Sequence, residues 1–267
     1  MASSAMLDYA RVCEKAARAG GAAVQSWVGR IDVREKGPAD LVTQADLASQ
    51  EAIRDTLLRA FPGHSLLGEE QDPAAATPPQ RTEYRWIADP LDGTTNFVHG
   101  VPHYSVSLAL ERHGELLVGA VYDPVRNECF TAIAGEGACL DGRPIRTSNI
   151  RELSGALAAV GFPARTPPDC PDLLVFLAAL EPCQAIRRTG STALNLCYLA
   201  AGRLDVYWSF SARIWDVAAG VLLVREAGGV VTSPDGGPFL LEEAQFLAAA
   251  NGQLHARLRE LVSRVRL

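Results

Sequence analysis

The chain has 267 residues, a formal net charge of −6 and 48% hydrophobic residues, which suits one large or two closely packed globular domains. The negative charge argues against nucleic-acid binding through bulk electrostatics, and no run of about 18 apolar residues could cross a membrane. The six cysteines form no C-x-x-C pair, and the N-terminus lacks the apolar core of a signal peptide. We therefore expect free thiols and a cytoplasmic location.

The first sixty residues predict two helices. Apolar residues at helical spacing cover 6–28, and Gly29 ends that helix. A short strand is expected at 31–33, a loop at 36–40, and a second helix from Asp40 to about Ala60. Thr43 and Asp46 have the spacing of a capping box, which by itself explains Asp46. The alternative is that Asp46 points from this helix start into a site.

An apolar run at 65–67 predicts a short strand that ends in Gly68-Glu69-Glu70. Two adjacent acids at a strand end cannot both face one way. Two solvated loop acids are the common arrangement, and the alternative is that one of them faces a site. Residues 71–83 contain three prolines and are predicted to form a surface loop.

The most informative stretch is 86–100, WIADPLDGTTNFVHG. A buried strand at 86–88 is expected to leave the sheet at Asp89-Pro90, and Asp92 follows three residues after Asp89. Gly93 and Thr94 then open a helix. Carboxylates bind hard cations, and free N–H groups at a helix start bind phosphate. The stretch therefore indicates a metal-dependent enzyme that acts on phosphate, against the plainer possibility of a polar strand-to-helix connection.

One rival pattern is D-x-D-G-T, the haloacid-dehalogenase type, in which the first aspartate is a covalent nucleophile. In this chain the acids are three residues apart, D-P-L-D-G-T, so the second acid points in a different direction. The spacing disfavours a covalent phosphoenzyme.

The remaining chain has two parts with different patterns of predicted elements. Alternating short runs at 105–134 predict an antiparallel meander, and strands alternate with helices from Ala156 onwards. Gly190-Ser191-Thr192 precedes a helix at 193–201 and is either a plain N-cap or a site for an anion or a hydroxyl-rich ligand. Asp216 is placed as an N-cap of the helix that Gly228-Gly229 closes. We predict an α+β half at 1–150 and an α/β half at 151–267, without a flexible linker.

Three segments together resemble the inositol monophosphatase family of magnesium-dependent phosphatases. They are Asp40–Asp46 with Lys36 ahead of it, Gly68-Glu69-Glu70 joined to Trp86–Phe97, and Trp215–Gly220 followed by Glu226–Gly229. The resemblance implies a layered αβαβα sandwich of the sugar-phosphatase type, inhibition by lithium and a homodimer. It implies metal ligation by Glu69, Asp89, Asp92, Asp216 and the Leu91 carbonyl.

The resemblance also assigns catalytic roles. Asp46 and Thr94 would orient and deprotonate a water, beside Glu69. The N–H groups of Gly93 and Thr94 would hold the phosphate, and Asp92 and Asp216 would also lie against the substrate. Two or three Mg²⁺ ions, with Mn²⁺ as a possible substitute, would serve as cofactor.

The chemistry of these residues agrees with that assignment. Several carboxylates brought together without cations would raise one another's pKa, and divalent cations remove the conflict. All the ligands are oxygens, which favours magnesium or manganese over zinc. We therefore expect hydrolysis of a small phosphate monoester by metal-activated water, without a covalent intermediate.

Substrate choice is less determined. Inositol-preferring relatives carry a glutamate where this chain has Ser209, before Arg213. Inositol monophosphate is still the first expectation. The alternatives are fructose 1,6-bisphosphate, glycerol 2-phosphate or histidinol phosphate, and a non-catalytic regulatory homologue. Four arginines could bind a second anionic group of a bisphosphate: Arg165, Arg187, Arg188 and Arg213.

Overall fold

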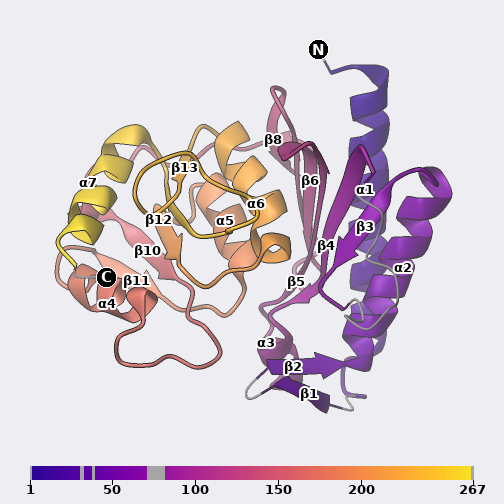
Figure 1. Cartoon of the computed structure of the whole chain (residues 1–267), viewed down its shortest axis with the longest axis horizontal. Coiled ribbons are helices and arrows are strands. Elements are labelled where there is room, and N and C mark those ends of the chain that lie inside the picture. Colours follow the sequence, from indigo (N-terminus) through magenta and orange to yellow (C-terminus); the bar gives the residue numbers. More distant parts are fainter. Residues whose placement is uncertain (1, 31–32, 38–39, 71–81, 266–267) are drawn as a thin grey trace.

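The computed structural model describes residues 2–30, 33–37, 40–70 and 82–265, and for residues 33–37 and 40 it describes the backbone alone. Its elements stack as five layers, αβαβα, as expected (Figure 1). Helices α1 (Ser4–Ser26) and α2 (Gln44–Ala60) form one outer layer, and α4 (Pro171–Ala179) and α7 (Gly252–Ser263) form the other. Between the two sheets lie α5 (Thr192–Ala200) and α6 (Ile214–Glu226).

The larger sheet has seven strands in the order β3-β4-β5-β6-β7-β8-β9. Its strands from β4 to β9 pair antiparallel, which confirms the meander, and β3 lies parallel to β4. The bounds are β3 (Ser65–Gly68), β4 (Tyr84–Asp92), β5 (Ser105–Arg112), β6 (Glu115–Asp123), β7 (Glu128–Ile133), β8 (Gly137–Leu140) and β9 (Arg143–Pro144).

Strand β4 continues further than the sequence predicted. Asp89 still pairs with Ser107 and Asp92 with Ser105, so one extra residue lies in β4 between these two pairs. Pro90 has no N–H to give to the ladder, and the chain bulges there before pairing resumes. The expected exit at Asp89-Pro90 was therefore wrong, and both aspartates lie on one irregular strand end. The short α3 (Thr94–Val98) follows directly.

Two predictions for residues 33–46 were also wrong. The predicted loop at 36–40 and the predicted helix start at Asp40 give way to a hairpin of β1 (Val33–Gly37) and β2 (Asp40–Thr43). The helix begins at Gln44, because Thr43 is its N-cap and accepts the Ala45 N–H. The strand expected at 31–33 and the loop expected at 71–83 fall largely outside the described residues.

The smaller sheet has the order β11-β10-β12-β14-β13. Strand β10 is parallel to β11 and β12, and β14 is antiparallel to β12 and β13. The bounds are β10 (Leu157–Val160), β11 (Ala185–Arg187), β12 (Val206–Ser209), β13 (Val230–Thr232) and β14 (Phe246–Ala249), with a 3-10 turn, η1, at Leu153–Gly155. Each sheet takes its strands from one side of residue 150. The division into two domains there stays a prediction.

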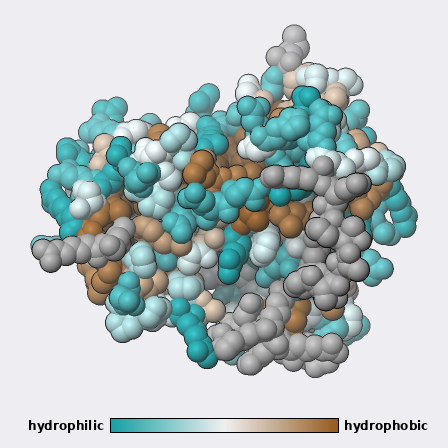
Figure 2. Space-filling view, in the orientation of Figure 1, coloured by the Kyte–Doolittle hydropathy of each residue, from teal (hydrophilic) through white to brown (hydrophobic). Residues whose placement is uncertain are grey.

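Helix α6 accounts for the layered arrangement. It is buried almost all round, from Val217 to Val224, as expected of an apolar helix between two sheets. The outer surface is mostly hydrophilic on the face that Figure 2 shows. The six cysteines are free thiols, as expected, and five are buried. No helix within the described ranges is long and apolar enough to cross a membrane.

Candidate active site

A cavity of about 370 Å³ brings together segments that are far apart in the sequence. It is lined by Glu69 after β3, by the Gly93–Asn96 turn after β4, by the start of α6 at Asp216, and by two loops of the C-terminal half. Seven of the predicted site residues line it: Glu69, Gly93, Thr94, Gly190, Ser191, Thr192 and Asp216. The other predicted site residues do not line it: Asp46, Asp89, Leu91, Asp92, Ser209 and Arg213. Asp46 contacts the lining residue Thr94, and Asp92 contacts the lining residues Ser191 and Thr192.

Asp46 and Thr94 meet as the resemblance implied. The fully buried carboxylate of Asp46 accepts the Thr43 N–H at 2.8 Å and the Thr43 hydroxyl at 2.6 Å through one oxygen. Its other oxygen lies 3.1 Å from Thr94 Oγ1, which is also 3.0 Å from the Leu91 carbonyl oxygen. The capping box is confirmed, and it leaves one oxygen of Asp46 for Thr94. Capping and contact with the cavity-lining threonine are thus compatible in one side chain.

The acids beside this dyad are crowded. Burial raises the pKa of Asp89, and the charges of Glu69, Asp92 and Asp216 raise it further, against the Leu91 N–H that Asp89 accepts at 2.9 Å. Burial, then the charge of Asp92, raises the pKa of Asp216 as well. These side chains therefore disfavour one another's ionised forms. Within the described part of the chain, no three such side chains already form a cluster that could hold a metal ion.

The carboxylate of Asp92 is bound by the start of α5. Its carboxylate accepts the Ser191 hydroxyl, the Thr192 N–H at 3.1 Å and the Ala193 N–H at 2.8 Å. Ser191 is also the N-cap of α5, accepting the Leu194 N–H at 3.2 Å. The Gly-Ser-Thr loop therefore does hold an anion, and that anion is the side chain of Asp92. Burial still leaves the pKa of Asp92 raised, because these hydrogen bonds offset it only in part.

Asp216 is not the N-cap that its position predicted. It is the third residue of α6 and accepts the N–H of Arg213, the N-cap position, at 2.8 Å. This hydrogen bond satisfies one N–H of the helix start that would otherwise be unpaired. Asp216 lies on the cavity wall.

Ser209 lies behind the wall of the cavity. Its side chain is buried and accepts the Ser211 N–H at 3.3 Å. A Cβ at Gly161 would lie 3.1 Å from both Ser209 Oγ and Tyr207 Oη, so Gly161 packs closely against both side chains. Of these three residues, Gly161 and Tyr207 line the cavity and Ser209 does not.

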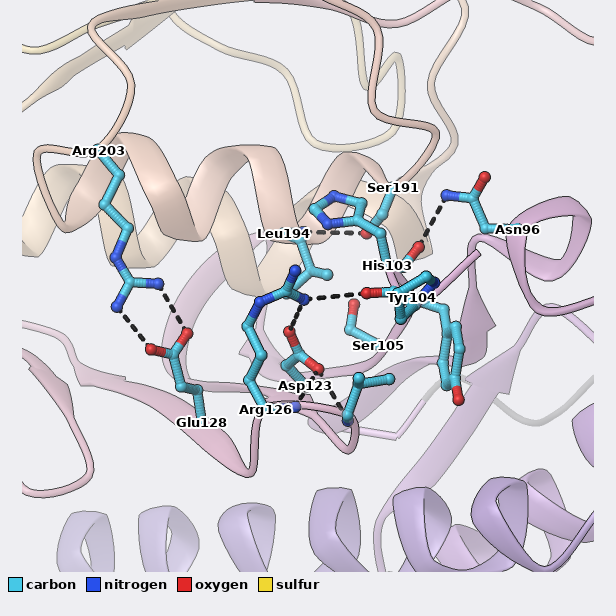
Figure 3. A network of polar contacts seen from close by, with 12 residues as sticks. Asn96, His103, Tyr104, Ser105, Asp123, Arg126, Glu128, Ser191, Leu194 and Arg203 are labelled. Carbon is cyan, nitrogen blue, oxygen red and sulfur yellow. Dashed lines mark hydrogen bonds and ion pairs between the residues drawn. The ribbon is translucent and has the colours of Figure 1, made fainter. Parts of the chain in front are cut away.

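The sequence analysis did not predict that two asparagines, Asn96 and Asn195, belong to the cavity wall. The amide of Asn96 donates to the His103 carbonyl at 2.8 Å (Figure 3). It also donates to the Thr189 carbonyl at 2.8 Å and so ties the α3 turn to the loop before α5. Asn195 accepts the Thr189 hydroxyl at 2.7 Å. Asparagine is unfavourable inside a helix, so its presence in the apolar run ALNLC was the available signal.

The wall is supported from behind by a second polar network. Arg126 donates to the buried carboxylate of Asp123 at 2.9 Å and to the Pro102 carbonyl at 3.1 Å (Figure 3). Arg203 meets Glu128 through two hydrogen bonds of 2.7 and 2.6 Å. The Arg126 contacts tie the loop at Pro102, next to the Asn96 partner His103, to the end of β6 at Asp123. The Arg203–Glu128 pair ties the segment after α5 to β7.

The chain was compared with known proteins. Residues 6–267 match the model of the Inositol monophosphatase family. The "Inositol-1-monophosphatase" of Rhizobium meliloti is 40% identical over 267 residues, covering 99% of this chain and 98% of that protein. The "Nus factor SuhB" of Pasteurella multocida is 42% identical over 238 residues, covering 88% of each.

Solved structures agree. The inositol monophosphatase of Anabaena superposes with a TM-score of 0.87 at 37% identity, covering 98% of both chains. The extragenic suppressor protein suhB of Bartonella henselae gives a TM-score of 0.88 at 37% identity, covering 95% of this chain and 98% of that one. The chain therefore belongs to the inositol monophosphatase family.

Proposed function

We propose that the protein is a magnesium-dependent phosphatase of small phosphate monoesters, with inositol monophosphate as the first substrate to test. The proposal is carried by four neighbouring acids: burial raises the pKa of Asp89, and the charges of Glu69, Asp92 and Asp216 raise it further. Glu69 and Asp216 line a cavity that has room for a small molecule. Related polyol and sugar phosphates, including glycerol 2-phosphate, fructose 1,6-bisphosphate and histidinol phosphate, are alternatives at the same site.

The donor set fits magnesium. Every candidate ligand is an oxygen, and a bound cation would favour the ionised forms of Asp89, Asp92 and Asp216, whose pKa values are raised by burial and by neighbouring acids. Glu69, Asp89, Asp92, Asp216 and the Leu91 carbonyl would hold two or three Mg²⁺ ions, with Mn²⁺ as a substitute. Magnesium held there would neutralise the phosphate charge and lower the pKa of a bound water.

The chain's own contribution to water activation is the Asp46–Thr94 pair. Thr94 has one hydroxyl proton and two acceptors within reach, Asp46 Oδ1 at 3.1 Å and the Leu91 carbonyl at 3.0 Å. When that proton points to Asp46, a lone pair of Thr94 Oγ1 is left to accept a hydrogen bond from the attacking water. Asp46 cannot turn away, because Thr43 fixes its other oxygen. The pair would orient the water and take its proton, with Glu69 nearby and no covalent intermediate.

The phosphate would lie against the turn after β4. Gly93 has φ of 96°, and a Cβ there would lie 3.1 Å from the His103 carbonyl oxygen and 3.3 Å from that of Gly190. Only glycine lets the chain turn there and pack this closely. Its N–H and that of Thr94 are the proposed phosphate donors, since both residues line the cavity.

The test is phosphate release with Mg²⁺ across inositol 1-phosphate, glycerol 2-phosphate, fructose 1,6-bisphosphate, histidinol phosphate and adenosine monophosphate. We expect turnover of at least one polyol or sugar phosphate, with inhibition by lithium. Absence of release from the whole panel would overturn the proposal. Gel filtration with light scattering would test the homodimer.

A second candidate is a regulatory role without turnover, and the name "Nus factor SuhB" that several relatives carry favours it. The same panel separates the two. A folded protein that binds Mg²⁺ but releases no phosphate from any substrate would support the regulatory role.

A further inference from the structure

Among the described residues that line the cavity, three carry charge: Glu69, Asp216 and Arg188. The two acids belong to the proposed metal site. Arg188 lies just after β11, on the C-terminal side of the cavity, where the alcohol of the substrate would be. It is the one cavity-lining residue among the four arginines that the sequence offered as partners for a second anionic group.

The guanidinium of Arg188 is held by packing and carries no counter-charge. It stacks over the Phe162 ring at 5.3 Å from the centroid, and Phe162 also lines the cavity. No ion pair or side-chain hydrogen bond of Arg188 occurs within the described residues. An arginine fixed on one face, with unused N–H donors, is suited to bind a phosphate or carboxylate through two hydrogen bonds.

The rest of this wall offers no competing carboxylate. Ser209, where the family resemblance leads us to expect a glutamate in inositol-preferring relatives, is a buried serine that does not line the cavity. The wall presents apolar and hydroxyl groups instead, from Val160, Phe162 and Tyr207. A carboxylate in the substrate would therefore meet a cation here, and no glutamate would repel it.

We propose that Arg188 makes this enzyme select phosphate monoesters that carry a second anionic group, a phosphate or a carboxylate, on the alcohol. This inference rests on the proposed function, because it places the scissile phosphate at the acids and the second anion at Arg188. Neutral polyol phosphates remain substrates, with lower kcat/KM.

The chain supplies a matched control. Arg187 is the neighbouring residue and is equally exposed, but it does not line the cavity and its guanidinium donates to the Ile186 carbonyl at 3.1 Å. Adjacent residues at a strand end point to opposite sides, which accounts for the difference. Arg187→Gln removes the same charge from the same segment without touching the cavity.

The test compares fructose 1-phosphate with fructose 1,6-bisphosphate, which differ by the second phosphate. The native protein is expected to prefer the bisphosphate in kcat/KM. Arg188→Gln should reduce that preference about tenfold, the effect of one charge-assisted hydrogen-bond pair at a partly exposed site, while Arg187→Gln should preserve it. An unchanged preference in Arg188→Gln, or an equal loss for both substrates, would overturn the inference.

Binding gives a readout that does not require turnover. Calorimetric titration of both sugars with Mg²⁺ into Asp46→Asn, with and without Arg188→Gln, should show about tenfold weaker binding of the bisphosphate only. If neither sugar nor any other panel substrate is hydrolysed but this selectivity in binding appears, the proposed function fails and the anion site stands. If substrates are hydrolysed and Arg188→Gln changes neither ratio, the anion site fails and the proposed function stands.

Discussion

Replacing Asp46 with asparagine separates its structural role from its proposed catalytic role. The asparagine oxygen can take the place of Oδ2 and keep both hydrogen bonds from Thr43, at 2.8 and 2.6 Å. Its amide nitrogen then faces Thr94 Oγ1 across 3.1 Å, and the Thr94 proton turns to the Leu91 carbonyl at 3.0 Å. The contacts with Thr43 and Thr94 can therefore persist, but the base that would receive the proton of water is gone.

The two magnitudes differ widely. Exchanging charged for neutral acceptors should cost about 1–2 kcal/mol in the free energy of unfolding, or roughly 2–8 °C in Tm. Loss of a general base should lower kcat by about 10²–10⁴-fold. The variant should therefore lose most of its turnover but little of its stability, which makes it informative.

The assay is kcat for Mg²⁺-dependent phosphate release at saturating substrate, beside a thermal melt. Asp55→Asn is the control, because Asp55 lies on the same helix and its ion pair with Arg59 is exposed. That control should keep native activity. An Asp46→Asn protein that melts cooperatively and retains kcat close to native would refute the role of Asp46 as the base.

Three further predictions follow from the site. Asp89→Asn should abolish phosphate release while leaving the metal-free fold at least as stable, since it removes a carboxyl whose ionised form is disfavoured by burial and by the neighbouring acids. Calorimetry should show weakened Mg²⁺ binding, and undiminished turnover would contradict the metal assignment. Gly93→Ala should lower the free energy of unfolding, measured by urea denaturation, by about 1–3 kcal/mol, and by more than Gly100→Ala does. Both glycines have positive φ, but of the two only Gly93 has backbone within 4 Å of the added Cβ. Equal losses would show that the close packing around Gly93 does not contribute to stability. Without metal, the free energy of unfolding should fall as pH rises from about 4 to 8. Burial raises the pKa of Asp92 to about 6 and of Asp216 to about 8, so the folded state keeps protons that the unfolded chain releases. Added Mg²⁺ should therefore raise Tm more at pH 8 than at pH 5, and an equal rise at both would count against these acids as ligands.

Local signals in the sequence predicted local structure well. The Thr43–Asp46 capping box, the apolar run before Asp89 and the meander after Ser105 all depend on neighbours in the chain, and the structure confirms each. The layered sandwich came from the family resemblance, and its apolar α6 matches a helix covered by sheets on both sides.

The misses depend on distant contacts or on competing local choices. Asp92 binds the start of α5 about 100 residues later in the chain, and no spacing rule reports such a pair. Ser209 is buried outside the cavity and packs against Gly161, which lies on another segment. The pairing of β1 with β2 was missed because Gly37 and Asp40, at the ends of these strands, are residue types that favour turns.

The central claim, a magnesium-dependent phosphatase, is tested most directly by phosphate release from inositol 1-phosphate and fructose 1,6-bisphosphate as Mg²⁺ is titrated into the metal-free protein. The account predicts no release with excess chelator and a saturating rise with Mg²⁺. Release that persists without divalent cation, or no release of phosphate at any Mg²⁺ concentration, would contradict it.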